Sequence, residues 1–183
     1  ADAQASLCLA LDWNNRYDEA ISACEAALQI DPANAEAHAF LAEALADSGR
    51  IEQALAAGER AIELAPASAD VHRGYGYALE ALGQFKEAEA SYQRAIELSP
   101  ESVHFRLTMA RLHRRMGAQE QSLHELNQIT DEFPTNPQPF YEIALVHYRA
   151  KRYDQAVAYF EESARLDTER ATTYVRIGWS YYL

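Results

Sequence analysis

Proline recurs at a fixed interval along this chain and limits what the chain can fold into. Pro32, Pro66, Pro100 and Pro134 lie 34 residues apart in a sequence of 183 residues. A proline stops a helix because it lacks a backbone N–H and pushes the preceding residue out of the helical region. The interval therefore indicates repeated units that end at equivalent points.

Other residue types align on the same interval. When the units are aligned, equivalent positions form columns, and the columns that contain Cys8 and Ala20 hold mostly small residues. A break lies between these two columns, and in later units it is marked by Gly49, Gly83 and Gly117. The apolar columns within a unit are spaced by about three, four and seven residues, which is helical spacing. Each unit therefore predicts a helix, a tight turn, a second helix and a stop. The small columns let the two helices of a pair approach closely.

This pattern resembles the tetratricopeptide repeat family over the whole chain. The resemblance implies an all-α fold, a right-handed solenoid of antiparallel helix pairs with about 5.5 repeats. We expect a single array with units at 1–34, 35–68, 69–102, 103–136 and 137–170, and the first helix of a sixth unit at 171–183.

Composition and motifs exclude several classes of function. The net charge of −12 disfavours nucleic acid as a partner. The sequence contains no run of about 18 apolar residues, so we expect no membrane insertion. No phosphate-binding loop, dinucleotide turn or nucleophile elbow is present, so we expect no catalysis, cofactor or metal.

Cys8 and Cys24 fall in core columns and are expected to be buried thiols that do not form a disulfide. His113 and His147 share one column and are expected in helix contacts. With no secretory leader visible, we expect a cytoplasmic protein.

The family resemblance implies that the first helix of each unit lines a concave surface that holds a peptide. Read column by column, this inner face carries seven carboxylates and one arginine in the first three units, and four arginines and no carboxylate in the next two. Arginine and tyrosine suit the binding of carboxylates and apolar groups. The predicted protein-binding residues are Tyr77, Arg111, Arg114, Arg115, Tyr141, Leu145, Tyr148 and Arg149. The competing interpretation is a solvated face with internal ion pairs, such as Glu80 with Arg111 or Arg114.

Two specialised subtypes of the family are not supported by the inner face. The carboxylate clamp of chaperone-binding repeats is missing. The column that would hold an asparagine ladder reads Ser6, Phe40, Gly74, Thr108, Glu142 and Arg176.

The sequence therefore predicts a non-catalytic scaffold that binds a protein or peptide, with acidic segments, in its concave groove. The alternatives are a recruiting or regulatory domain of a larger enzyme and a self-assembly module that uses the solenoid ends. An apolar C-terminal patch motivates the second alternative, because no later helix covers it and a second copy could. Its residues are Trp179, Tyr181, Tyr182 and Leu183.

Overall fold

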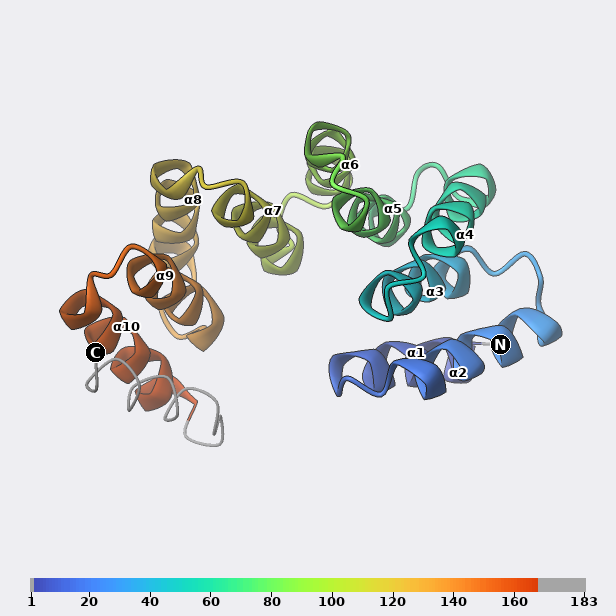
Figure 1. The fold of residues 1–183 in the computed structure, drawn as a ribbon, viewed down its shortest axis with the longest axis horizontal. Helices are drawn as coiled ribbons and strands as arrows, with labels where there is room; N and C mark the ends of the chain where they lie inside the picture. Colours follow the sequence, from blue (N-terminus) through green and yellow to red (C-terminus); the bar gives the residue numbers. More distant parts are fainter. Residues whose placement is uncertain (1, 168–183) are drawn as a thin grey trace. The chain divides into compact units, whose positions relative to one another are not determined.

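A computed structural model describes residues 2–167 and shows only helices and turns in that range (Figure 1). The helices are α1 (Asp2–Trp13), α2 (Tyr17–Ile30), α3 (Ala35–Asp47), α4 (Ile51–Leu64), α5 (Ala69–Ala81), α6 (Phe85–Leu98), α7 (Val103–Arg115), α8 (Gln119–Glu132), α9 (Pro137–Arg149) and α10 (Tyr153–Leu166). The all-α repeat architecture predicted from the 34-residue interval is confirmed over this range. The expected helix at 171–183 lies outside the described residues.

The turns within helix pairs share one backbone geometry. Gly49, Gly83 and Gly117 have φ near +80°, and the equivalent residues Asn15 and Lys151 have φ of 59°. The residue after each of them donates its N–H to the carbonyl five residues earlier, as from Gln84 to Leu79 at 2.9 Å. This hydrogen bond spans six residues and is characteristic of the Schellman motif, in which a residue in the left-handed conformation ends a helix. The predicted break between the paired helices is therefore a C-cap of fixed geometry.

The junctions between units stop the second helix and start the next first helix. Helices α2, α4 and α6 end at Ile30, Leu64 and Leu98, just before the recurring prolines. The side chain of Asn34 then caps α3 by accepting from the Ala37 N–H at 2.9 Å. Asn136 caps α9 in a related way, with Pro137 in the first turn. The starts of α3 and α9 therefore follow from local sequence, whereas Ser68 before α5 makes no side-chain cap.

Small residues allow close helix contacts, as the columns predict. Ala20, Ala54, Ala88 and Ala156 are fully buried. A Cβ built on Gly76 in α5 would lie 2.6 Å from the ring of Tyr92 in α6, so a side chain there would displace that ring. A Cβ on Gly74 would lie 2.7 Å from the Ala39 carbonyl oxygen of α3. Glycine is therefore required both within a pair and between neighbouring pairs.

The structure corrects one expectation about the first repeat. Cys8 of α1 and Cys24 of α2 form a disulfide, with their Cα atoms 5.3 Å apart. Both side chains are fully buried at the contact between the paired helices. Both residues lie in the core as their columns predict, but the expectation of free thiols does not hold. It was wrong because the two columns face each other directly across the pair.

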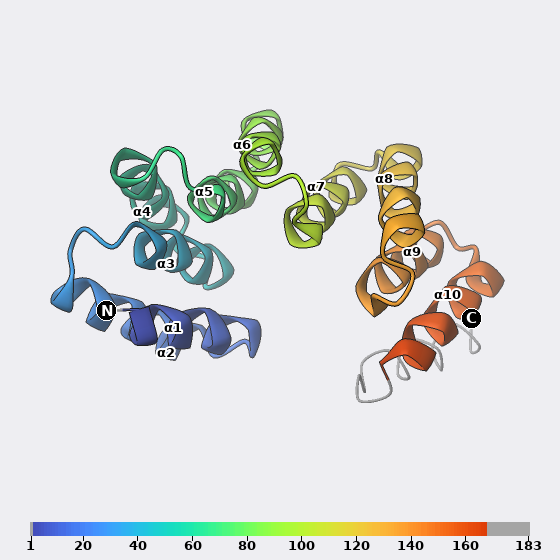
Figure 2. The same cartoon turned by 180° about the vertical axis from the view of Figure 1, so that it is seen from behind.

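The chain divides into two compact units, and the division falls in the first turn of α7, between Phe105 and Arg106. In the first unit, α1 packs on α2 and α3, α3 packs on α4 and α5, and α5 packs on α6 (Figures 1 and 2). In the second unit, α9 packs on both α8 and α10. The handedness of the array stays a prediction.

Candidate functional site

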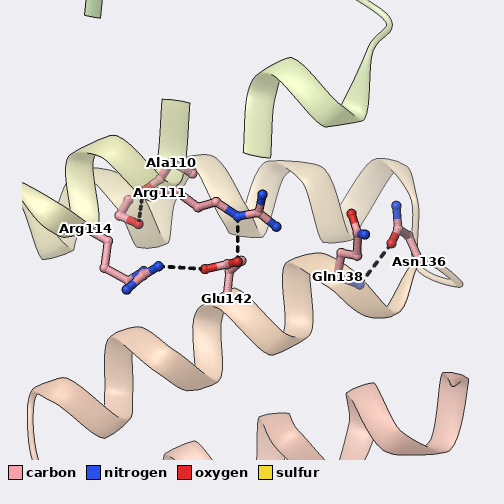
Figure 3. Close-up of polar contacts among 7 residues, drawn as sticks. Ala110, Arg111, Arg114, Asn136, Gln138 and Glu142 are labelled. Carbon is pink, nitrogen blue, oxygen red and sulfur yellow. Dashed lines mark hydrogen bonds and ion pairs between the residues drawn. The ribbon is translucent and has the colours of Figure 1, made fainter. Parts of the chain in front are cut away.

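A carboxylate on α9 holds two arginines of α7 in the second unit (Figure 3). Arg111 donates from Nε to Oε1 of Glu142 at 2.6 Å, and Arg114 donates from Nη2 to Oε2 at 3.2 Å. The two arginines are three residues apart, so they lie on one face of α7. Glu142 therefore links neighbouring first helices and fixes both guanidinium groups. We call Arg111, Arg114, Arg115, Arg149 and Glu142 the arginine site.

Positive charge exceeds negative charge at the arginine site. Glu142 is only 5% exposed, and the Arg114 side chain is 10% exposed with a buried Nε that makes no hydrogen bond. Burial lowers the pKa of Arg114, and Arg149, Arg115 and Arg111 lower it further, whereas Glu142 opposes them. Among the described groups that act on the charge of Arg114, one carboxylate thus opposes three other guanidinium groups. An additional anion would reduce this repulsion.

The aromatic and aliphatic side chains predicted for the site make contacts within the fold itself. Tyr141, Leu145 and Tyr148 pack against the buried cluster formed by Ala144, Ala156 and Phe160. The rings of Tyr141 and Phe160 are 5.4 Å apart, and those of Tyr148 and Tyr153 are 5.6 Å apart. These side chains are half-buried.

The remaining predicted residues do not join this group. Tyr77 lies in α5 of the first unit, where its hydroxyl donates to Asp47 of α3 at 2.9 Å. Trp179, Tyr181, Tyr182 and Leu183 lie outside the described residues. The structure therefore brings together the arginines with Tyr141, Leu145 and Tyr148 within one unit.

The acidic inner face of the first unit is more buried than sequence analysis anticipated. Arg73 of α5 donates to Glu43 of α3 at 2.5 Å, and both side chains are about 5% exposed. Tyr92 donates to the buried Glu80 at 2.9 Å. Asp12 at the end of α1 is also buried. These carboxylates are packed between helices and are not a solvated charged face.

Glu142 is a partner of the arginines that the sequence did not predict. The interpretation from sequence pairs Glu80 with Arg111 or Arg114, and the Glu142 column enters it only as a possible asparagine ladder. The signal was present in the spacing: Glu142 follows Arg111 by 31 residues, and Arg73 and Tyr77 follow their partners by 30. Side chains that pair between neighbouring first helices are therefore separated by 30 or 31 residues, which is about one helical turn less than the 34-residue repeat.

The two shared-column histidines have structural partners. His113 lies 2.9 Å from Glu125, and the His147 ring stacks on Tyr159 with centroids 5.5 Å apart. Burial lowers the pKa of His147, and Arg152 lowers it further. Among residues 2–167, no group of three or more His, Cys, Asp or Glu side chains is arranged to hold a metal ion. In the same range, no helix is long and apolar enough to cross a membrane.

Comparison with known proteins identifies the repeat and the fold. One model of the tetratricopeptide repeat (TPR) matches residues 14–76, 47–93 and 79–141, and another matches residues 137–170. No curated protein sequence matches the chain.

Several solved structures are similar. A thermophilic TPR protein from Thermus thermophilus has a TM-score of 0.87 at 20% identity, covering 100% of this chain and 99% of its own. Pseudomonas aeruginosa PilF has a TM-score of 0.67 at 22% identity, covering 96% and 80%. YrrB, described as a TPR protein with an unusual peptide-binding site, has a TM-score of 0.59 at 18% identity, covering 93% and 88%. At these identities the likeness concerns the fold, whereas the repeat models match nearly the whole sequence from residue 14 to residue 170. The chain therefore belongs to the tetratricopeptide repeat family.

Proposed function

We propose that this protein is a non-catalytic interaction module that binds an acidic segment of a partner protein at the arginine site. The TPR fold generally serves as a scaffold for protein–protein interaction, and its members are typically not catalytic. YrrB, which has a similar fold, is described as having a peptide-binding site. The observation that carries the proposal is that one carboxylate, Glu142, holds two arginines, Arg111 and Arg114, while the exposed Arg149 also acts on Arg114.

The arrangement suits recognition of a carboxylate. Glu142 holds Arg111 and Arg114 in place, so little side-chain entropy is lost when a ligand binds. The guanidinium group of Arg111 is partly exposed, and Arg149 is exposed. Arginine presents five N–H donors in a planar fork, so a guanidinium group that already binds Glu142 can bind a second carboxylate. The half-buried Tyr141, Leu145 and Tyr148 would supply apolar contact on the same helix.

The first test measures binding of capped hexaglutamate by calorimetry. Arg149→Ala should weaken binding by about threefold, because an exposed ion pair contributes little. Glu142→Gln should strengthen binding by roughly threefold or more, because the glutamine amide oxygen can still accept from an arginine and keep it in place, whereas the competing negative charge is gone. Both effects should shrink at high salt.

Arg165→Ala is the matched control, because Arg165 is an exposed arginine on α10 whose partner is Glu162. It removes the same unit of charge from the second unit and should leave hexaglutamate affinity nearly unchanged. The proposal is wrong if Arg165→Ala and Arg149→Ala weaken binding equally, or if Glu142→Gln weakens it while the protein remains folded.

A further inference from the structure

The first unit contains buried carboxylate oxygens that lack a partner. Asp12 of α1 is 6% exposed, and its Oδ1 atom makes no hydrogen bond. Oε1 of Glu43 on α3 is likewise buried and without a hydrogen bond. An ionised carboxylate in a protein interior costs free energy unless it is paired and hydrogen-bonded. These oxygens are therefore unused acceptors inside a folded unit.

The nearby cation, Arg73, already pairs with two carboxylates, and its buried Nε makes no hydrogen bond. Arg73 of α5 donates to the other oxygen of Glu43, and its Nε lies 3.6 Å from Asp70. Asp47, one turn after Glu43 on α3, accepts only from the hydroxyl of Tyr77 among the hydrogen bonds described for it. Asp12, Glu43 and Asp47 are thus three carboxylates on two adjacent helices, with one arginine that is shared with Asp70.

The electrostatics of Asp12 agree with this geometry. Burial, followed by Asp47 and Glu43, raises its pKa from 3.8 to about 7, and Arg73 only partly opposes them. The charged and titratable groups that face Asp12 are Glu43 and Asp47 from α3, Arg73 from α5, and Tyr17 from α2. The balance of these groups is negative, so a positive group brought to Asp12 would keep its carboxylate ionised.

We propose that Asp12, Glu43 and Asp47 form a binding site for the guanidinium or ammonium group of an arginine or lysine side chain on a partner protein. This site rests on the proposed function as an interaction module and adds a second ligand chemistry to it. Asp47 is exposed and would meet the partner side chain first. The long apolar stem of arginine or lysine can carry the charge to the buried oxygens behind it.

Trp13 supports a cationic side chain as the ligand. It follows Asp12 at the end of α1, and it is 65% exposed, which is unusual for tryptophan. Its ring lies near that of His104, with centroids 6.4 Å apart. A guanidinium or ammonium group binds the face of an indole ring. A bare metal ion is disfavoured, because no three potential ligands are suitably placed in the described part of the chain.

The test titrates the whole protein with capped triarginine at pH 8 and follows binding by calorimetry and by tryptophan fluorescence. Asp12→Asn keeps the size of the side chain and removes its charge, and it should lower the affinity about tenfold. Glu52→Gln is the matched control. Glu52 is an exposed carboxylate of α4, so Glu52→Gln gives the protein the same net charge as Asp12→Asn. It should lower the affinity for triarginine less than about twofold. Asp47→Asn provides a second variant at the exposed edge of the site.

The pH dependence gives an independent readout. Triarginine should bind wild type more weakly at pH 6 than at pH 8, because protonated Asp12 cannot pair with it, whereas Asp12→Asn should show little change over this range. Capped trilysine should behave like triarginine. Uncapped trialanine, whose positive group is a terminal ammonium, should bind poorly, which assigns the ligand to a side chain.

The inference is overturned if Asp12→Asn and Glu52→Gln reduce binding equally, since that describes attraction to the net negative charge of the chain. It is also overturned if wild type shows no pH dependence, or if trialanine binds as well as triarginine. Hexaglutamate binding at the arginine site separates the two proposals. If hexaglutamate binds as expected and triarginine does not, only this inference fails; if neither binds, the proposed function fails.

Discussion

Asp12 illustrates how one buried carboxylate links stability to binding. Its pKa of about 7 in the folded chain lies above its ordinary value of 3.8. Between these two pH values the folded state holds a proton that the unfolded state has released, so stability falls as pH rises through this window. Above pH 7 the folded protein contains the carboxylate in its ionised, unpaired form. A residue selected only for stability would not be an aspartate.

Asp12→Asn should therefore stabilise the protein, by on the order of 1–2 kcal/mol at pH 8 after allowance for solvent screening. The gain should decrease as the pH falls and be small at pH 4, where Asp12 is protonated in the folded state and a little under half protonated in the unfolded state. Urea unfolding at pH 4, 6 and 8 measures it, with Glu52→Gln expected to have a small effect at every pH. A loss of stability in Asp12→Asn at pH 8 would contradict the assignment of an unpaired carboxylate.

At the scale of the helices, the turn within each pair depends on one left-handed residue. Gly83 has φ of +85°, and a Cβ added there would meet nothing within 4 Å. Space is therefore not the constraint, and the backbone conformation is. Asn15 occupies the equivalent position in the first repeat with φ of 59°, which agrees with the tolerance of asparagine for this region.

Gly83→Ala should destabilise the protein by about 1 kcal/mol, because alanine is strained in the left-handed region. Gly83→Asn should cost clearly less, since asparagine already serves this role at position 15. Thermal unfolding of the two variants beside wild type compares them directly. Equal losses would mean that the cost comes from a contact and not from the backbone.

The same scale shows what sequence could predict. Helix ends and turns follow from local signals such as Pro66, Gly83 and Asn34. The partners of buried side chains depend on how neighbouring helices are offset. For that reason the Cys8–Cys24 disulfide was wrongly dismissed and Glu142 was overlooked, although the residues themselves were correctly placed in columns. The roughly 30-residue separation of inner-face partners would have found Glu142.

At the scale of the whole molecule, the two parts of the sequence differ in net charge although they share one repeat fold. Residues 1–102 have 6 basic and 18 acidic side chains, for a net charge of −12, whereas residues 103–183 have 10 of each. Repeats are stabilised mainly by their neighbours, so the columns that pack can stay constant while inner-face residues vary. The two proposed sites accordingly recognise opposite charges: a cationic side chain at Asp12 and a carboxylate at the arginine site.

The disulfide should stabilise the first repeat. Cys8 and Cys24 are 16 residues apart, and closing a loop of about this length removes roughly 3 kcal/mol of unfolded-state entropy. The protein purified without reductant should not react with maleimide at these positions. Reduction should expose both thiols to the reagent once the protein is unfolded, and it should lower the unfolding midpoint. Reaction of both thiols in the untreated protein would show that the cross-link does not form.

A cross-link at this point gives the N-terminal repeat a dependence on its surroundings. Disulfides persist in oxidising compartments and are rare in the cytosol, so the presence of the Cys8–Cys24 bond depends on the redox conditions around the protein. In a reducing environment, α1 would be held only by packing against α2 and α3, and α1 carries both Asp12 and Trp13. Loss of α1 would remove the cation site while leaving the arginine site in place. The oxidation state of two cysteines would then decide whether this molecule binds cationic side chains in addition to carboxylates.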